Sequence, residues 1–148
     1  IDSISPKILA SATDYKDIQK AYGSYYKACN FKISDIKKDC QRMKQILDIQ
    51  DSCLSFIELR KNIDSNNQKL ATFSKTAKNI YGAYTSYFKG ADLAWTADNT
   101  CTAKLRNVIE VQNQFLKVMS SSKVSELDEQ VKKMKDKSFE NIKKQIFD

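Results

Sequence analysis

The sequence predicts an all-α protein, a disulfide-stapled bundle of five to six helices, and three observations support this class. Glycine occurs three times and proline once in 148 residues, so the tight turns of β-hairpins would be hard to build. Apolar residues recur every three or four positions along most of the chain, as they do on one face of a helix. Four cysteines occur without a histidine. The length suits a single domain over residues 1–148.

The first half of the chain is expected to hold three helices after an N-terminal arm at residues 1–11. The first helix begins near Thr13, and its buried stripe is Tyr15, Ile18, Tyr22, Tyr25 and Cys29. The second begins after Ser34 and has the stripe Ile36, Cys40, Met43 and Leu47. Polar residues at 48–52 should break it, and the third helix then carries Cys53, Phe56, Ile57 and Ile63. Residues 62–67 indicate a turn, because Asn, Asp and Ser side chains compete with helical backbone hydrogen bonds.

The second half is expected to hold three more helices. The strongest pattern runs from Leu70 to Phe88, and it ends at Gly90, where a positive φ would close the helix. The next helix starts at Asp98 or Asn99, and its buried stripe is Cys101, Leu105, Val108, Phe115 and Met119. The last is expected to begin with a capping arrangement of Ser125 and Asp128. The phase of its stripe slips between Met134 and Phe139, which predicts a bend or a change of packing partner.

The four cysteines, Cys29, Cys40, Cys53 and Cys101, favour two disulfides. They lack the short C-x-x-C knuckles of zinc sites and of thioredoxin-like proteins. Helices on either side of a break near residues 30–34 would bring Cys29 beside Cys40. The favoured pairing is therefore Cys29–Cys40 with Cys53–Cys101, although four cysteines allow three connectivities. Buried free thiols in a cytosolic protein are the alternative.

Enzyme chemistry has little support in the sequence. Without histidine, a cysteine nucleophile lacks its usual base. The three glycines are too far apart to form a phosphate-binding loop, and no calcium-binding loop is found. We therefore expect no catalytic residue, no metal site and no cofactor.

The formal net charge of +7 favours anionic partners. The densest basic patches are residues 37–44 and 132–137, where Lys133 and Lys137 would share one helical face; a merely solvated surface is the simpler alternative. Neither patch interleaves aromatic residues, so nucleic acid is not expected, and no apolar run approaches the roughly 20 residues of a membrane span. The candidate partner-binding residues are Lys37, Lys38, Arg42, Tyr87, Trp95, Lys133 and Lys137.

Aromatic residues gather between positions 81 and 95, and core packing would explain most of them. Tyr87 and Trp95 could instead be exposed anchors for a protein partner. A third interpretation is a cavity for a small apolar ligand, lined by Phe73, Ile80, Tyr84 and Phe115.

The segment from Cys53 to Cys101 also carries a family resemblance. A cysteine opens a helix at Cys53, Ser-Lys-Thr-Ala follows at residues 74–77 and then Tyr84, and Cys101 begins the next helix. This order, with Cys40 upstream, resembles the TsetseEP-like family of secreted insect proteins. The resemblance implies an extracellular protein of insect gut, haemolymph or saliva, and it brings no catalytic residues.

Together these observations predict a secreted, non-enzymatic binding protein, expected to be a monomer. Its partner would be a protein, such as cuticle or a host haemostatic or immune component. A polyanion is a further candidate partner. The alternative function is that of a carrier of small hydrophobic ligands.

Overall fold

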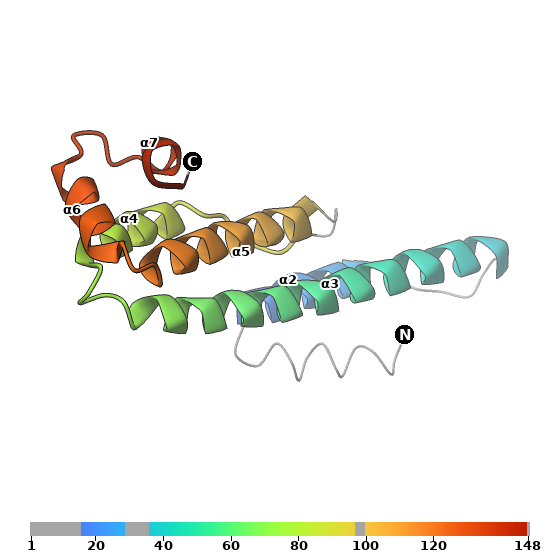
Figure 1. The fold of residues 1–148 in the computed structure, drawn as a ribbon. Helices are drawn as coiled ribbons and strands as arrows, with labels where there is room; N and C mark the ends of the chain where they lie inside the picture. The colour runs from blue at the N-terminus through green and yellow to red at the C-terminus, as the bar shows by residue number, and fades with distance from the viewer. Residues whose placement is uncertain (1–15, 29–35, 97–99, 148) are drawn as a thin grey trace. The chain divides into compact units, whose positions relative to one another are not determined.

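The computed structural model describes residues 16–28, 36–96 and 100–147, and these residues form helices joined by turns (Figure 1). Within those ranges there are six α-helices, a terminal π-helical turn and no strand. The elements are α2 Lys16–Ala28, α3 Ile36–Ala71, α4 Lys78–Lys89, α5 Thr100–Met119, α6 Val124–Lys133, α7 Phe139–Ile142 and η2 Lys143–Phe147. The predicted all-α class is confirmed. The expected arm at residues 1–11 lies outside the described residues.

The chain divides into two compact units, each built from segments that are distant in sequence. Unit 1 consists of Ile1–Arg60 and Leu93–Leu105, and unit 2 of Lys61–Asp92 and Arg106–Asp148. The boundaries fall inside α3 and α5, so each of these helices contributes residues to both units.

Helix α3 is a single helix of 36 residues, so the breaks predicted at residues 48–52 and 62–67 are wrong. Asp, Asn and Ser lower helix propensity by only about 0.5 kcal/mol each, and packing readily outweighs that. Asn66 shows how, because its side chain is buried and bonds to Gln112 rather than to its own backbone. The predicted stripe is also shifted, since Met43 is 40% exposed and Ile46 and Ile49 are buried instead.

Unit 1 places the one tryptophan of the chain in its interior. Trp95 packs edge-on against Tyr22, with ring centroids 6.4 Å apart. The Tyr22 hydroxyl accepts a 2.7 Å hydrogen bond from the Gln50 amide, and the Arg60 guanidinium donates to the carbonyl of Leu93 at 3.0 Å. Helix α2 buries Ile18 and Tyr22 as predicted, whereas Tyr15 and the side chains of Tyr25 and Cys29 lie outside the described residues.

Unit 2 is organised around Phe115, which is fully buried. The centroid of its ring lies 5.3 Å from that of Tyr84, 5.0 Å from that of Phe147 and 6.2 Å from that of Phe139. The Tyr84 and Phe147 contacts are edge-to-face, a geometry that stabilises beyond simple burial of area.

The predicted α5 stripe is confirmed, since its five members are all buried.

The predicted helix from Leu70 to Phe88 is interrupted by a turn at residues 72–77, and Asp128 explains how α4 begins. The Ala77 cap has no side chain that can accept a hydrogen bond. Instead Asp128 Oδ1 accepts from the backbone N–H groups of Asn79 and Ile80 at 2.8 and 2.9 Å. Asp128 therefore satisfies the start of α4 from α6, not the start of its own helix as predicted. The positive φ predicted at Gly90 is also wrong, since its φ is −87°.

The apolar stripe of the last predicted helix is interrupted between Met134 and Phe139, where its phase changes, as predicted. Met134 has an extended backbone, so α6 ends at Lys133. The short α7 then begins at a Ser138 cap, whose hydroxyl accepts from the Asn141 N–H at 3.4 Å. Because Lys137 lies beyond the end of α6, the prediction that it shares a helical face with Lys133 is wrong.

Candidate functional site

The structure does not contain the predicted disulfide between Cys53 and Cys101, and both are buried free thiols. Burial raises the pKa of Cys53 to about 12, and the charge of Cys101 adds to this shift. Both cysteines belong to unit 1. The side chains of Cys29 and Cys40 lie outside the described residues. The structure therefore supports the predicted all-α class but gives no support for the predicted disulfide bonds between the helices.

The predicted partner-binding residues do not form one surface. Trp95 is only 7% exposed, so its prediction as an exposed anchor is wrong; its ring is used in packing against Tyr22. Tyr87 is half-buried, with its ring centroid 4.5 Å from that of Phe139, and burial raises its pKa. The side chains of Lys37, Lys38 and Arg42 lie outside the described residues.

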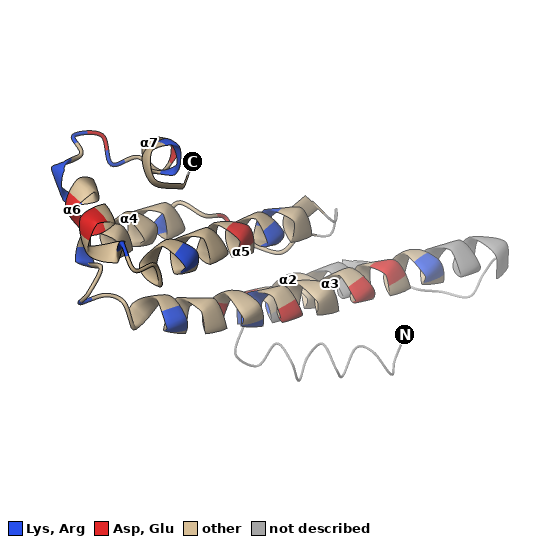
Figure 2. Cartoon of the chain, in the orientation of Figure 1, with Lys and Arg blue, Asp and Glu red and all other residues tan. Residues whose placement is uncertain are grey.

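Lys133 and Lys137, in contrast, belong to one strongly charged surface, which we call the basic C-terminal segment (residues 132–144). It holds six lysines and two acidic residues, a local formal charge of +4. All six lysines are exposed. Figure 2 shows this charge along the connection between α6 and α7. More than half of the net charge of the chain is therefore carried by 13 residues of unit 2.

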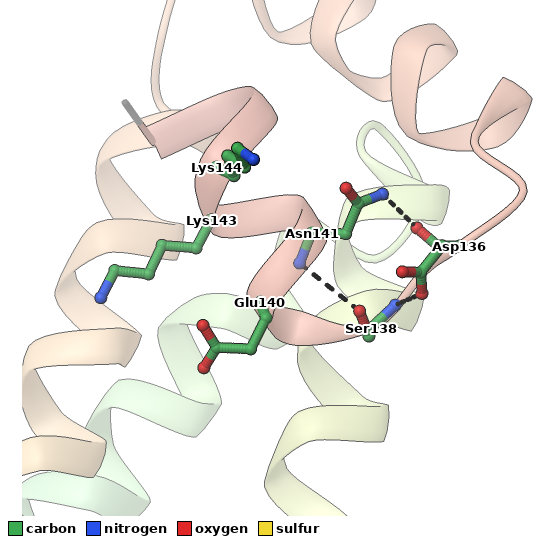
Figure 3. Close-up of a pocket in the computed structure, with 6 residues that line it drawn as sticks. All are labelled: Asp136, Ser138, Glu140, Asn141, Lys143 and Lys144. Carbon is green, nitrogen blue, oxygen red and sulfur yellow. Dashed lines mark hydrogen bonds between the residues drawn. The ribbon is translucent and has the colours of Figure 1, made fainter.

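The basic C-terminal segment borders an open, shallow polar pocket of about 570 Å³ (Figure 3). Its lining residues are Asp136, Ser138, Glu140, Asn141, Lys143 and Lys144. Asp136 accepts from the Ser138 N–H at 3.0 Å, and its backbone carbonyl accepts from the Asn141 amide at 2.6 Å. These bonds fix the shape of the turn. Figure 3 shows Lys143 and Glu140 extending away from this bonded group.

Hydrogen bonds from Ser138 lower the pKa of Asp136, so this carboxylate stays charged. It is therefore a poor proton donor at neutral pH. Among the described residues, no cluster of three or more Cys, Asp or Glu side chains is placed to hold a metal ion. The lining of the pocket carries two ammonium groups and two carboxylates, so it has no net charge of its own. The excess positive charge of the segment lies on the lysines outside this lining, and these suit acidic groups of a partner.

A second polar cluster lies inside unit 2 and is fully bonded. The Gln112 amide nitrogen lies within hydrogen-bond distance of the Ile63 carbonyl, Asn67 Oδ1 and the Tyr84 hydroxyl, at 2.8–3.1 Å. Its oxygen accepts from Asn66 at 3.1 Å. Burial raises the pKa of Tyr84 to about 12, although its bond to Gln112 opposes that shift. The cluster keeps its protons at neutral pH and holds α3, α4 and α5 together within the unit.

Sequence reasoning missed Ser138, Asn141, Lys143 and Lys144. The sequence predicts a bend between Met134 and Phe139, but the second predicted basic patch ends at residue 137, so these four residues fall outside it. The phase slip could have located them. It marks where a new helix begins, and a Ser at that point suits a helix N-cap.

The residues expected to line a ligand cavity lie in or against the core of unit 2. Ile80, Tyr84 and Phe115 belong to its buried cluster, and Phe73 packs against it. A smaller, half-open groove is lined by a different set: Gln114, Lys117, Val118, Ser121, Leu127, Ile146 and Phe147.

No protein-family model, curated protein or solved structure matches the chain. The resemblance to the TsetseEP-like family therefore stays a prediction. In the part of the chain that the structure describes, no helix combines the length and the apolar character needed to cross a bilayer.

Proposed function

We propose that the chain is a non-enzymatic binding protein that contacts a protein partner through the basic C-terminal segment. One observation carries this proposal: six exposed lysines lie in 13 consecutive residues. For none of them does the structure record an ion pair with another described residue. A surface with this charge attracts acidic partners and accelerates their association.

A protein partner is favoured over a simple polyanion by the apolar side chains within the same segment. Met134 and Phe139 are each partly exposed, and Tyr87 packs against Phe139. Protein interfaces combine a buried apolar centre with a charged rim. A polyanion would use the lysines alone, and its binding would be more sensitive to salt.

The proposed setting is extracellular and follows from the family resemblance, which suggests insect gut, haemolymph or saliva. The partner would then be cuticle or a host haemostatic or immune component. Cys53 and Cys101 could join in an oxidising compartment, where a disulfide donor accepts their two electrons and two protons. Their burial in the same unit supports this pairing. Mass mapping of non-reduced peptides from protein taken from its native source tests it.

The test of the function is a pull-down with three baits, of which the two variants have the same net charge. One bait is wild type, the second carries Lys133→Gln, Lys137→Gln and Lys144→Gln, and the third carries Lys16→Gln, Lys20→Gln and Lys44→Gln. Both variants lose three positive charges at exposed positions, so they differ only in location. Mouthpart, haemolymph and host plasma extracts are the sources.

We expect a protein that wild type and the third bait retain and the second bait loses. Equal retention by all three baits, or equal loss by both variants, would contradict the proposal. On a heparin column, wild type that elutes below physiological salt would exclude the polyanion alternative.

A further inference from the structure

The groove between α5, α6 and η2 is a second candidate site, separate from the polar pocket. Its volume is about 340 Å³, at the small end of the range of about 300–1,000 Å³ for ligand pockets. Gln114, Lys117 and Val118 share one face of α5, at the i, i+3 and i+4 positions, and Ser121 lies just beyond the end of that helix. All lining residues belong to unit 2.

The floor of the groove is apolar and already packed in place. Val118, Leu127, Ile146 and Phe147 rest against the buried core cluster while each stays partly exposed. Phe147 is held by edge-to-face contacts, with its ring centroid 5.0 Å from that of Phe115 and 6.3 Å from that of Phe139. A ligand would therefore meet a preformed apolar surface, which reduces the entropic cost of binding.

The rim of the groove carries one positive charge. Lys117 is exposed, and the structure records no ion pair for it with another described residue. Gln114 is also exposed and can donate hydrogen bonds from its amide. The lining includes no Asp or Glu. A ligand with a single anionic group would complement the charge of this rim.

We propose that this groove binds a free fatty-acid anion of medium chain length. The carboxylate lies at Lys117 and Gln114, and the acyl chain covers Val118, Leu127, Ile146 and Phe147. At about 30 Å³ for each water-sized group, the groove holds roughly eleven such groups, which suits a chain of about eight to ten carbons. This site is independent of the protein partner proposed above, because the two sites share no residue.

The test is isothermal titration of the full chain with decanoate below its micelle concentration. We expect saturable binding with one site. Lys117→Gln should weaken it by about two- to fivefold, the range for an exposed ion pair. Lys75→Gln removes an equally exposed charge outside the groove and should leave binding unchanged. Octanoate should bind more weakly than decanoate, by at most about fourfold per methylene.

Two further measurements separate this proposal from nonspecific binding. Gln114→Phe fills the groove from an exposed position and should abolish binding while the circular dichroism spectrum stays native. Decanol should bind wild type and Lys117→Gln equally. The proposal is overturned if decanoate shows no saturable binding, or if Lys117→Gln and Lys75→Gln change its affinity equally. None of these results bears on the baits used for the protein partner.

Discussion

The two units differ in how they treat polar groups inside them. In unit 2, Gln112, Asn66, Asn67 and Tyr84 bond to one another, and no buried side-chain polar atom among its described residues lacks a partner. Unit 1 buries two free thiols. It also buries the Ser52 hydroxyl and the Trp95 indole N–H, neither of which finds a hydrogen-bond partner among the described residues.

The extent of internal hydrogen bonding indicates which unit can present a well-defined surface. Directional bonds that are all satisfied specify one arrangement of the helices, whereas apolar packing tolerates several. Unit 2 therefore offers the more rigid support, and both proposed binding surfaces lie on it.

The largest effect is expected from the centre of unit 2. Phe115→Ala removes a fully buried ring that contacts three other aromatic rings. It should lower the free energy of unfolding by about 3–5 kcal/mol, as measured by urea denaturation followed by far-ultraviolet circular dichroism. A loss below about 1.5 kcal/mol would mean that the core collapses around the gap, and the picture of a rigid unit 2 would fail.

The buried polar groups give the sharpest contrast between the units. Gln112→Leu should destabilise by about 2–3 kcal/mol, because Asn66 and the Ile63 carbonyl are left unsatisfied inside the protein. Ser52→Ala, in unit 1, removes a hydroxyl that has no partner, so it should change stability by less than about 0.5 kcal/mol or increase it. The same urea titrations measure both. Similar losses of stability for the two variants would contradict this contrast between the units.

Loss of Asp128, the residue of α6 that caps the start of α4, should have an intermediate effect on stability. Asp128→Ala removes the acceptor of three hydrogen bonds at the start of that helix, with an expected loss of about 1–2 kcal/mol. Glu129→Ala, an exposed neighbour in the same helix, is the control and should stay within about 0.5 kcal/mol of wild type. A loss in the control equal to that of Asp128→Ala would assign the effect to α6 rather than to the cap.

The smallest effect concerns pH and is absent at neutrality. Burial raises the pKa of Tyr84 from about 10 to about 12, so the folded state holds this proton more tightly than the unfolded chain. Stability should therefore fall as pH rises from about 10 to about 12. Tyr84→Phe should flatten that part of the profile, measured by thermal melts at each pH. An unchanged slope in Tyr84→Phe would show that another group controls alkaline unfolding.

The fold class and the α5 stripe could be predicted because they depend on spacing alone. Cys101, Leu105, Val108, Phe115 and Met119 repeat with a helical period, and burial follows from that. Helix α3 could not be delimited in this way. Its Asp, Asn and Ser residues favour breaks locally, and only the tertiary bond from Asn66 to Gln112 shows why the helix continues.

The candidate site was predictable only in part, for the same reason. Lys133 and Lys137 could be predicted as candidate binding residues because the density of charge can be read directly from the sequence. The pocket depends on the backbone turn at Met134 and on bonds between Asp136, Ser138 and Asn141. Exposure of Trp95 could not be judged either, because a large aromatic side chain suits a core and a partner surface equally well.

Lysine footprinting of the complex tests most directly the claim that unit 2 carries the binding surface. Acetylation of exposed amines is mapped by mass spectrometry for the chain alone and for the chain with its captured partner. We predict that the lysines of the basic C-terminal segment lose reactivity in the complex while Lys16, Lys20 and Lys44 keep theirs. Protection of those three residues, with residues 132–144 as reactive as in the free chain, would contradict it.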